Sequence, residues 1–206
     1  MLILGLTGGI ACGKSHISDT LRGLGAAVVD GDRIARELTA PAGPALAPIR
    51  REFGGGVFRA DGTLDRAALG RIVFADAEAL GRLNDLMRPL LRGRIDAEIE
   101  AARARGERVC VLDMPLLYEE GLDARCRRVW CAVVPPQVQL ERLRVRDGLS
   151  AEEAADRVRS QLPVSEKASR ADVVIDTDRP MLDTEAAVRA LYAGELLREE
   201  GERHAG

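Results

Sequence analysis

Five short apolar runs punctuate the chain, separated by glycine, aspartate and longer mixed stretches, a pattern typical of buried β-strands. The runs are Leu2–Leu6, Ala26–Val29, Val109–Leu112, Val129–Val134 and Val173–Ile175. Between them, apolar residues recur at helical spacing, as Ile17, Leu21 and Leu24 do within Ser15–Leu24. Strands that alternate with helices predict an α/β fold with a mainly parallel five-stranded sheet flanked by helices.

The second and third runs are about 80 residues apart, whereas a crossover between parallel strands needs only about a dozen. Helical patterns fill this gap, and Pro89 predicts a kink in the longest of them. These patterns cover Pro44–Phe53, Asp65–Phe74 and Asp76–Arg105. We therefore expect a helical subdomain inserted into the sheet domain.

A second helical region, Gln137–Gln161, breaks at Asp147-Gly148 and restarts where Ser150 and Glu153 have the spacing of a capping box. Leu182–Arg203 is predicted to form a closing helix. The length favours a single domain over residues 1–206. We divide it into a core (1–35, 106–136 and 170–206), a helical insert (about 36–105) and a lid segment (about 137–169).

The composition argues against several functional classes of protein. The 206 residues carry 30 basic and 33 acidic side chains, a formal charge of −3 and 3% aromatic residues, which argues against nucleic-acid binding. No apolar run approaches the roughly 18 residues of a membrane span, and the start lacks a leader pattern. The four cysteines lack CxxC spacing, which favours reduced thiols. We expect a cytoplasmic monomer or weak homo-oligomer without a membrane partner.

All but two of the basic residues are arginine, and the exceptions are Lys14 and Lys167. Lys14 completes G-x-x-x-x-G-K-[ST] between the first strand and the following helix, a phosphate-binding P-loop pattern. In such a loop, backbone N–H groups and the helix N-terminus face phosphate oxygens. Lys14 would contact the β- and γ-phosphates, and the Ser15 hydroxyl would bind Mg²⁺. The predicted ATP and Mg²⁺ site comprises Gly8, Gly9, Ile10, Ala11, Cys12, Gly13, Lys14, Ser15 and His16.

Three aspartates follow predicted strands, at the edge where parallel sheets bind ligands. Of Asp30 and Asp32, one could take a proton from an acceptor hydroxyl while the other helps to hold water on Mg²⁺. Alternatively, Asp32 caps a helix that starts at Arg33. Asp113 ends the third strand, where P-loop proteins carry a carboxylate that contacts water bound to Mg²⁺.

The lid segment concentrates arginine, and Arg142 and Arg146 share one helix face at i,i+4. Most arginines of so Arg-rich a chain are surface residues, but this group favours a lid that neutralises charge during phosphoryl transfer. The N-K-x-D motif of GTPases and the L-S-G-G-Q stretch of ABC-type ATPases are absent from the sequence. A small-molecule kinase is favoured, and a nucleotide-binding protein without transfer activity stays open.

Five longer motifs follow one another along the chain: LTGGIACGKS (residues 6–15), DGDRIAR (30–36), DMPLLYE (113–119), QLERLRVRDGLS (139–150) and ADVVID (171–176). With these motifs in this order, the chain resembles the dephospho-CoA kinase family over nearly its whole length. The resemblance implies a P-loop NTPase fold and an enzyme that uses ATP and Mg²⁺ to phosphorylate the ribose 3′-hydroxyl of dephospho-CoA, the last step of coenzyme A synthesis. Another P-loop kinase, acting on a nucleoside, nucleotide or small alcohol, is the alternative.

Carried over by this resemblance, Asp32 is the catalytic base, Lys14 the phosphate clamp, and Arg142 the lid residue that stabilises the transferring group. Arg146 joins the nucleotide-binding set, and Asp176 is expected near the adenine. The helices of 65–105 would form the CoA side. The chain departs from the family pattern at Cys12, Gly31, Arg88 and Thr177, and the last departure weakens the expected adenine contact. Lys167 has either a structural or nucleotide-side role or a solvated position.

Overall fold

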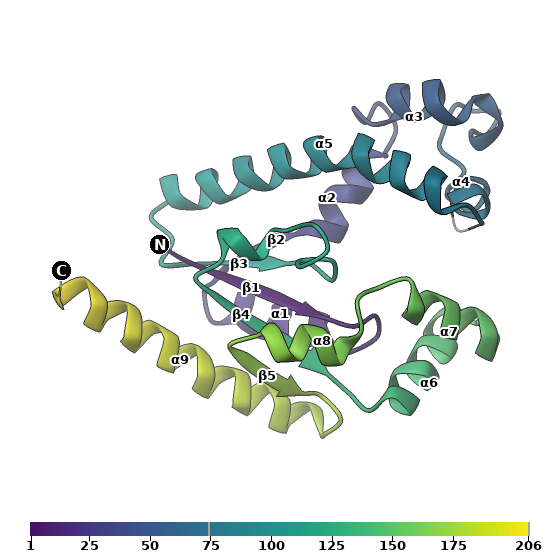
Figure 1. The fold of residues 1–206 in the computed structure, drawn as a ribbon. Helices are drawn as coiled ribbons and strands as arrows, with labels where there is room; N and C mark the ends of the chain where they lie inside the picture. Colours follow the sequence, from purple (N-terminus) through teal and green to yellow (C-terminus); the bar gives the residue numbers. More distant parts are fainter. Residues whose placement is uncertain (74, 206) are drawn as a thin grey trace. The chain divides into compact units, whose positions relative to one another are not determined.

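In the computed structural model, which describes residues 1–73 and 75–205 with side chains up to 201, five strands form one sheet (Figure 1). The strands are β1 (Leu2–Gly8), β2 (Ala27–Asp30), β3 (Val109–Asp113), β4 (Arg128–Val133) and β5 (Val173–Asp176), in the spatial order β2-β3-β1-β4-β5. β1 pairs in parallel with both β3 and β4, and β4 pairs in parallel with β5. The predicted five-stranded α/β sheet is confirmed.

The chain divides into two compact units. The first, called the core unit, combines residues 1–29 with 102–206, and the second, called the helical unit, spans 30–101. The helices of the core unit are α1 (Lys14–Gly23), the 3₁₀ turn η2 (Asp123–Arg125), α6 (Pro136–Asp147), α7 (Ala151–Arg159), α8 (Val164–Arg170) and α9 (Met181–Ala205). The division into core, insert and lid segment by function stays a prediction.

The helical unit contains three helices that the apolar spacing of the long gap predicts: α3 (Leu46–Phe53), α4 (Arg66–Val73) and α5 (Ala77–Ala104), whose end passes into the core unit. It also contains α2 (Gly31–Leu38) and the 3₁₀ turn η1 (Gly55–Val57), which lie outside the predicted segments. Pro89 lies inside α5, which continues through it as one helix. Phe74, the predicted end of one segment, lies outside the described residues. Arg33 joins α2 to α5 by a salt bridge of 2.6 Å to Glu98.

The two faces of the sheet have different partners within the core unit. On β1, Leu2, Leu4 and Leu6 join a buried cluster with residues of α1 and α9. Gly5 faces the opposite way, because a Cβ on it would lie 2.8 Å from Leu117 Cδ2. Figure 1 draws α8 in front of the sheet and α1 behind it. The phosphate loop between β1 and α1 therefore leaves a strand that is packed on both faces.

The lid segment holds α6, α7 and nearly all of α8. α6 ends at Gly148, whose backbone is left-handed with φ 67°. α7 starts at the capping box of Ser150 and Glu153, and this prediction is confirmed. The sequence pattern did not predict α8 as a separate helix. The helix is short, and its buried side chain is Lys167, so it lacks the apolar spacing by which helices are recognised.

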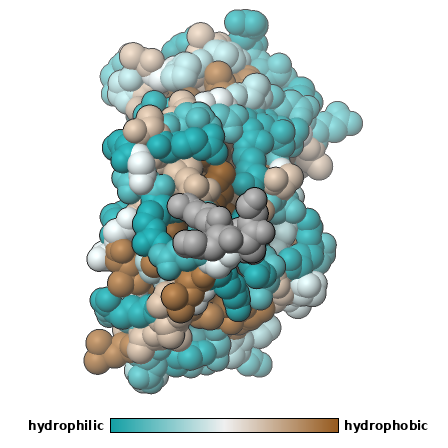
Figure 2. Space-filling model, turned by 90° about the vertical axis from the view of Figure 1, so that its left-hand side faces the viewer, coloured by the Kyte–Doolittle hydropathy of each residue, from teal (hydrophilic) through white to brown (hydrophobic). Residues whose placement is uncertain are grey.

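The surface agrees with the charged composition. Hydrophilic residues cover most of the face shown in Figure 2, and hydrophobic residues occur between them. Among the helices of the described residues, none is both long and apolar enough to cross a bilayer.

Candidate active site

The shape of the phosphate loop depends on close approaches to its neighbours. Gly13 has φ 78°, and a Cβ there would lie 2.9 Å from Thr177 Oγ1. A Cβ on Gly9 would lie 2.5 Å from Gln139 Nε2. Gly13 is therefore required by its left-handed backbone and by the close Thr177 side chain, whereas a Cβ on Gly9 would displace the Gln139 amide. Ala11 adopts φ 61° without being glycine, so the loop stores backbone strain.

The backbone N–H groups of the loop fall into two sets. That of Ile10 donates to Gln161 Oε1 at 3.0 Å, and that of Cys12 donates to the Gly9 carbonyl at 3.1 Å. A second set, at the N-terminus of α1, has no hydrogen-bond partner among the residues described: Gly13, Lys14 and Ser15. Unpaired N–H groups at the positive end of a helix dipole form an anion site. This set fits the phosphates of a nucleoside triphosphate.

A lysine and a carboxylate meet beside these groups. Lys14 Nζ donates to Asp113 Oδ1 at 2.7 Å, and the two side chains are 13% and 9% exposed. The sheet register places Asp113 next to Leu6, so the end of β3 lies beside the strand that enters the loop. The sequence analysis predicted both residues for this site, and the structure brings them into direct contact.

Arg142 reaches the loop through Thr177. Its Nη2 donates to the Thr177 carbonyl at 3.0 Å and its Nη1 to Thr177 Oγ1 at 3.3 Å. Thr177 Oγ1 in turn donates to the carbonyl of Cys12 at 3.0 Å. The family pattern predicts a weakened adenine contact at Thr177, and this stays a prediction. In the structure, the buried Thr177 hydroxyl links the loop to Arg142.

The other lid arginine that we assigned to nucleotide binding faces a different partner. Arg146 Nε donates to Asp147 Oδ1 at 2.8 Å, and Arg157 Nη1 donates to Asp147 Oδ2 at 2.6 Å. The Arg146 hydrogen bond in particular keeps the pKa of Asp147 below its usual value. These contacts join α6 to α7. Arg142 and Arg146 share a helix face in the sequence pattern, yet they hold different parts of the core unit.

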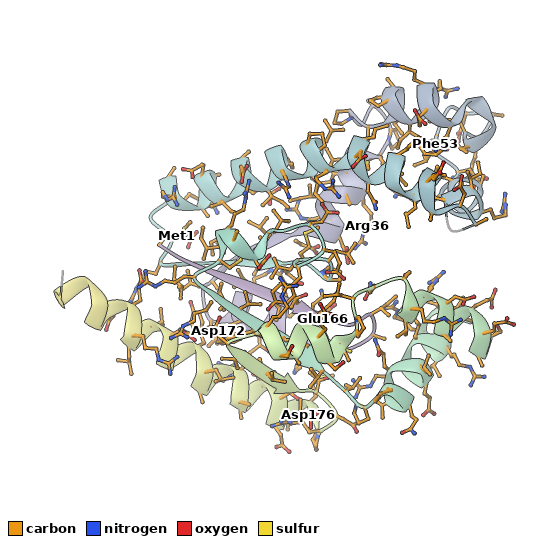
Figure 3. All side chains as sticks on the ribbon, viewed as in Figure 1. Met1, Arg36, Phe53, Glu166, Asp172 and Asp176 are labelled. Atoms are coloured by element: carbon orange, nitrogen blue, oxygen red, sulfur yellow. The ribbon has the colours of Figure 1, made fainter. Side chains whose placement is uncertain are left out.

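Asp30, not Asp32, caps α2. Asp30 Oδ1 accepts the N–H of Arg33 at 2.9 Å, so the alternative reading of Asp32 as the cap is wrong. Asp32 lies exposed in the first turn of α2, and its carbonyl accepts Arg36 Nε at 3.1 Å. Figure 3 labels Arg36 on this helix. Asp32 belongs to the helical unit, whereas Lys14 belongs to the core unit.

Asp176 ends β5, and Figure 3 labels it as well as Asp172, the residue that precedes this strand. Its side chain accepts the backbone N–H of Asp178 at 2.8 Å. The carboxylate is exposed and organises the turn that leads to Thr177 and α9. The Asp176 side chain therefore holds the backbone of residues 176–178 in a turn at the end of the sheet.

Cys12 contributes shape to the loop rather than reactivity. Its side chain is buried, and this burial raises the pKa of its thiol. All four cysteines carry free thiols. A raised pKa keeps the thiol protonated at neutral pH, so Cys12 is a poor nucleophile.

The donors near the loop fit magnesium bound together with a triphosphate. Within residues 1–73 and 75–205, no group of three or more His, Cys, Asp or Glu side chains is arranged to hold a metal. Mg²⁺ usually keeps several waters and takes few protein ligands beside substrate phosphates. The Ser15 hydroxyl at the start of α1 and, through bound water, the Asp113 carboxylate have the oxygen chemistry that such a site would use.

The comparisons with known proteins agree with this geometry. The profile of the dephospho-CoA kinase family matches residues 2–183. The dephospho-CoA kinase of Symbiobacterium thermophilum is 48% identical over 95% of this chain and 83% of its own length. That of Moorella thermoacetica is 44% identical over 93% and 91%. The solved dephospho-CoA kinase from Campylobacter jejuni aligns with TM-score 0.67 and 26% identity, covering 93% of this chain and 95% of that one. This chain belongs to the dephospho-CoA kinase family.

Proposed function

We propose that this protein transfers the γ-phosphoryl group of ATP to the ribose 3′-hydroxyl of dephospho-CoA, giving coenzyme A and ADP. The observation that carries the proposal is the loop of the core unit, where three unpaired N–H groups adjoin Lys14, 2.7 Å from Asp113. Membership of the dephospho-CoA kinase family supports the choice of acceptor.

The phosphates of ATP would be held by residues 13–15, where N–H groups, the helix dipole and the Lys14 ammonium act on the same anion. Lys14 would then exchange its contact with Asp113 for phosphate oxygens. Ser15 and, through water, Asp113 would hold Mg²⁺, which when bound supplies positive charge that neutralises phosphate oxygens. Asp176 and the turn after it would receive the adenine.

Asp32 would serve as the base. Its carboxylate takes the proton of the acceptor hydroxyl, whose oxygen forms the new bond to phosphorus while the bond to the ADP oxygen breaks. Arg142 would leave Thr177 and stabilise the charge on the transferring group. The helices of residues 65–105 would bind the CoA side of the acceptor, and the lid segment would exclude water.

An ADP-release assay with ATP, Mg²⁺ and dephospho-CoA tests the proposal, and phosphorus NMR of the product locates the new phosphate. We expect release to require both the acceptor and Mg²⁺, and the phosphate to lie on the ribose 3′-oxygen. Faster release with a nucleoside or another alcohol would assign a different acceptor. ATP binding without acceptor-dependent release would identify a nucleotide-binding protein instead.

A further inference from the structure

The second lysine of the chain is completely buried. Lys167 is 0% exposed in α8, although lysine is seldom buried without a partner. Its Nζ lies 2.7 Å from Glu119 Oε1 and donates to the Pro115 carbonyl at 2.6 Å. Both acceptors belong to the segment that leaves β3 after Asp113. The solvated position that the sequence analysis left open is therefore wrong.

The Pro115 carbonyl connects this lysine to the phosphate loop. It also accepts the hydroxyl of Thr7, at 3.1 Å. Thr7 is a buried residue at the end of β1, directly before the loop, and Pro115 lies two residues beyond Asp113. This one carbonyl oxygen therefore links the C-terminal ends of β1 and β3. Beyond these two strand ends, Lys14 and Asp113 contact each other.

Glu119 connects the same lysine to the chain that returns from the lid segment. Glu119 Oε1 accepts the N–H of Leu162 at 3.0 Å. The preceding residue, Gln161, accepts the N–H of Ile10 with its Oε1 at 3.0 Å. Two adjacent residues after α7 are therefore fixed, one to the phosphate loop and the other to the Lys167–Glu119 pair.

Stability alone does not account for such a pair. Removing two charges from water is costly, and replacing a buried ion pair by well-packed hydrophobic side chains of similar volume is often neutral or stabilising. Glu119 Oε2 adds to the cost, because it is buried and has no hydrogen-bond partner within the described part of the chain. What the pair provides instead is a fixed geometry for three segments: the exits of β1 and β3 and the return from the lid segment.

We infer that Lys167 and Glu119 form a positioning pair that holds Asp113 at the end of β3 and the return from the lid segment in register with the phosphate loop. The inference rests on the proposed function, because the reaction for which these groups are positioned is phosphoryl transfer. It acts through Pro115 and Leu162, and neither charged side chain is required to touch a substrate.

The test is the double variant Lys167→Met with Glu119→Gln. It removes both charges together, while the side-chain oxygen of the introduced glutamine still offers Leu162 an acceptor. The matched control is Arg170→Met with Asp123→Asn, which removes a salt bridge of 3.5 Å between α8 and η2 whose side chains are 42% and 30% exposed. We expect the double variant to fold and to lose on the order of tenfold or more in kcat, with KM for ATP changed by less than about threefold. The control should match the unmodified protein in both.

Hydrogen exchange in the absence of ligands gives a second readout that needs no turnover. The backbone N–H groups of Ile10 and Leu162 should exchange faster in the double variant and at unchanged rates in the control. Unchanged kcat together with unchanged exchange would overturn the inference and leave the pair as packing. If the unmodified protein shows no turnover with dephospho-CoA, the proposed function fails, while the exchange rates still decide the positioning role.

A milder variant covers the case in which the double variant does not fold. Thr7→Val keeps the volume of a buried side chain but removes the other donor to the Pro115 carbonyl. We expect a smaller loss of kcat, of a few fold, with unchanged affinity for ATP measured by calorimetry. A normal kcat in a folded Thr7→Val protein would show that the Pro115 link does not position the site.

Discussion

The two lysines of this arginine-rich chain have the same kind of environment. Lys14 and Lys167 each lie 2.7 Å from a carboxylate, and their side chains are 13% and 0% exposed. A compact ammonium can aim three donors from a narrow site, whereas a planar guanidinium needs a wide, flat partner. We conclude that this arginine-rich chain has lysine at positions 14 and 167 because each position requires a compact buried charge.

Lys14→Ala removes the charge that faces the phosphates. We expect weaker ATP binding and a loss of turnover on the order of a hundredfold or more, because both the bound state and the transition state use this ammonium. Calorimetry with ATP, beside a steady-state assay, measures both effects, and Arg189→Ala on the exposed face of α9 serves as the control. Unchanged ATP affinity would contradict the role of Lys14 as phosphate clamp.

Asp32→Asn tests the proposed base. The amide cannot take a proton, so we expect transfer to fall by on the order of a hundredfold or more while ATP affinity stays within about twofold. Asp30→Asn is the matched variant, since an asparagine oxygen still caps α2. If Asp30→Asn abolishes transfer and Asp32→Asn does not, the two roles are reversed.

At the scale of elements, both ends of the α6–α7 hairpin bind one residue of the loop. Gln139 Nε2 on α6 donates to the Ile10 carbonyl at 2.9 Å, and Gln161 after α7 accepts the Ile10 N–H at 3.0 Å. Gln139 is buried, which fixes its amide against the loop. A movement of the hairpin must therefore break these contacts or carry the loop with it.

Gln161→Leu removes the acceptor of the Ile10 N–H at similar volume. We expect faster hydrogen exchange at Ile10 and a kcat lowered by a few fold, because the loop loses one of its two hydrogen bonds to the α6–α7 hairpin. Gln137→Leu, at an exposed position in the first turn of α6, is the control. Equal exchange rates at Ile10 in both variants would show that the glutamine does not anchor the loop.

At the scale of the whole molecule, burial shifts several ionisable groups in the same direction. It raises the pKa of Cys126 and of Cys131 from an ordinary 9.0 to about 12. The folded protein therefore keeps these protons at a pH where the unfolded chain has released them. These two thiols therefore lower the stability as the pH rises from 9.0 to about 12, because there their folded forms bind more protons than their unfolded forms.

Alkaline unfolding tests this linkage. We expect the free energy of unfolding to decline above pH 9.0, each thiol contributing up to about 1.4 kcal/mol per pH unit. Urea titrations at several pH values measure the slope, and Cys131→Ala should reduce it. The same slope in the variant and the unmodified protein would rule out Cys131 as a source of the decline.

How far the sequence reading reached depended on the kind of residue. Strands and helices with regular apolar spacing were predicted, as was the capping box at Ser150, since local patterns determine them. α8 and the link through Thr177 were missed, because the first hides a lysine on its buried face and the second joins residues 165 positions apart. The alternative in which Asp32 caps the helix was wrong, because the side chain of Asp30, two residues earlier, accepts the N–H of Arg33.

The sequence by itself determined the order of elements, the phosphate loop and the chemistry that the loop can perform, because apolar periodicity and the spacing of glycine, lysine and serine are local properties. The tertiary structure alone decided which partners meet. It pairs Lys14 with Asp113, turns Arg142 to Thr177 and buries Lys167 against Glu119. Such contacts depend on how the strands are ordered in the sheet, and no short window of sequence carries that order.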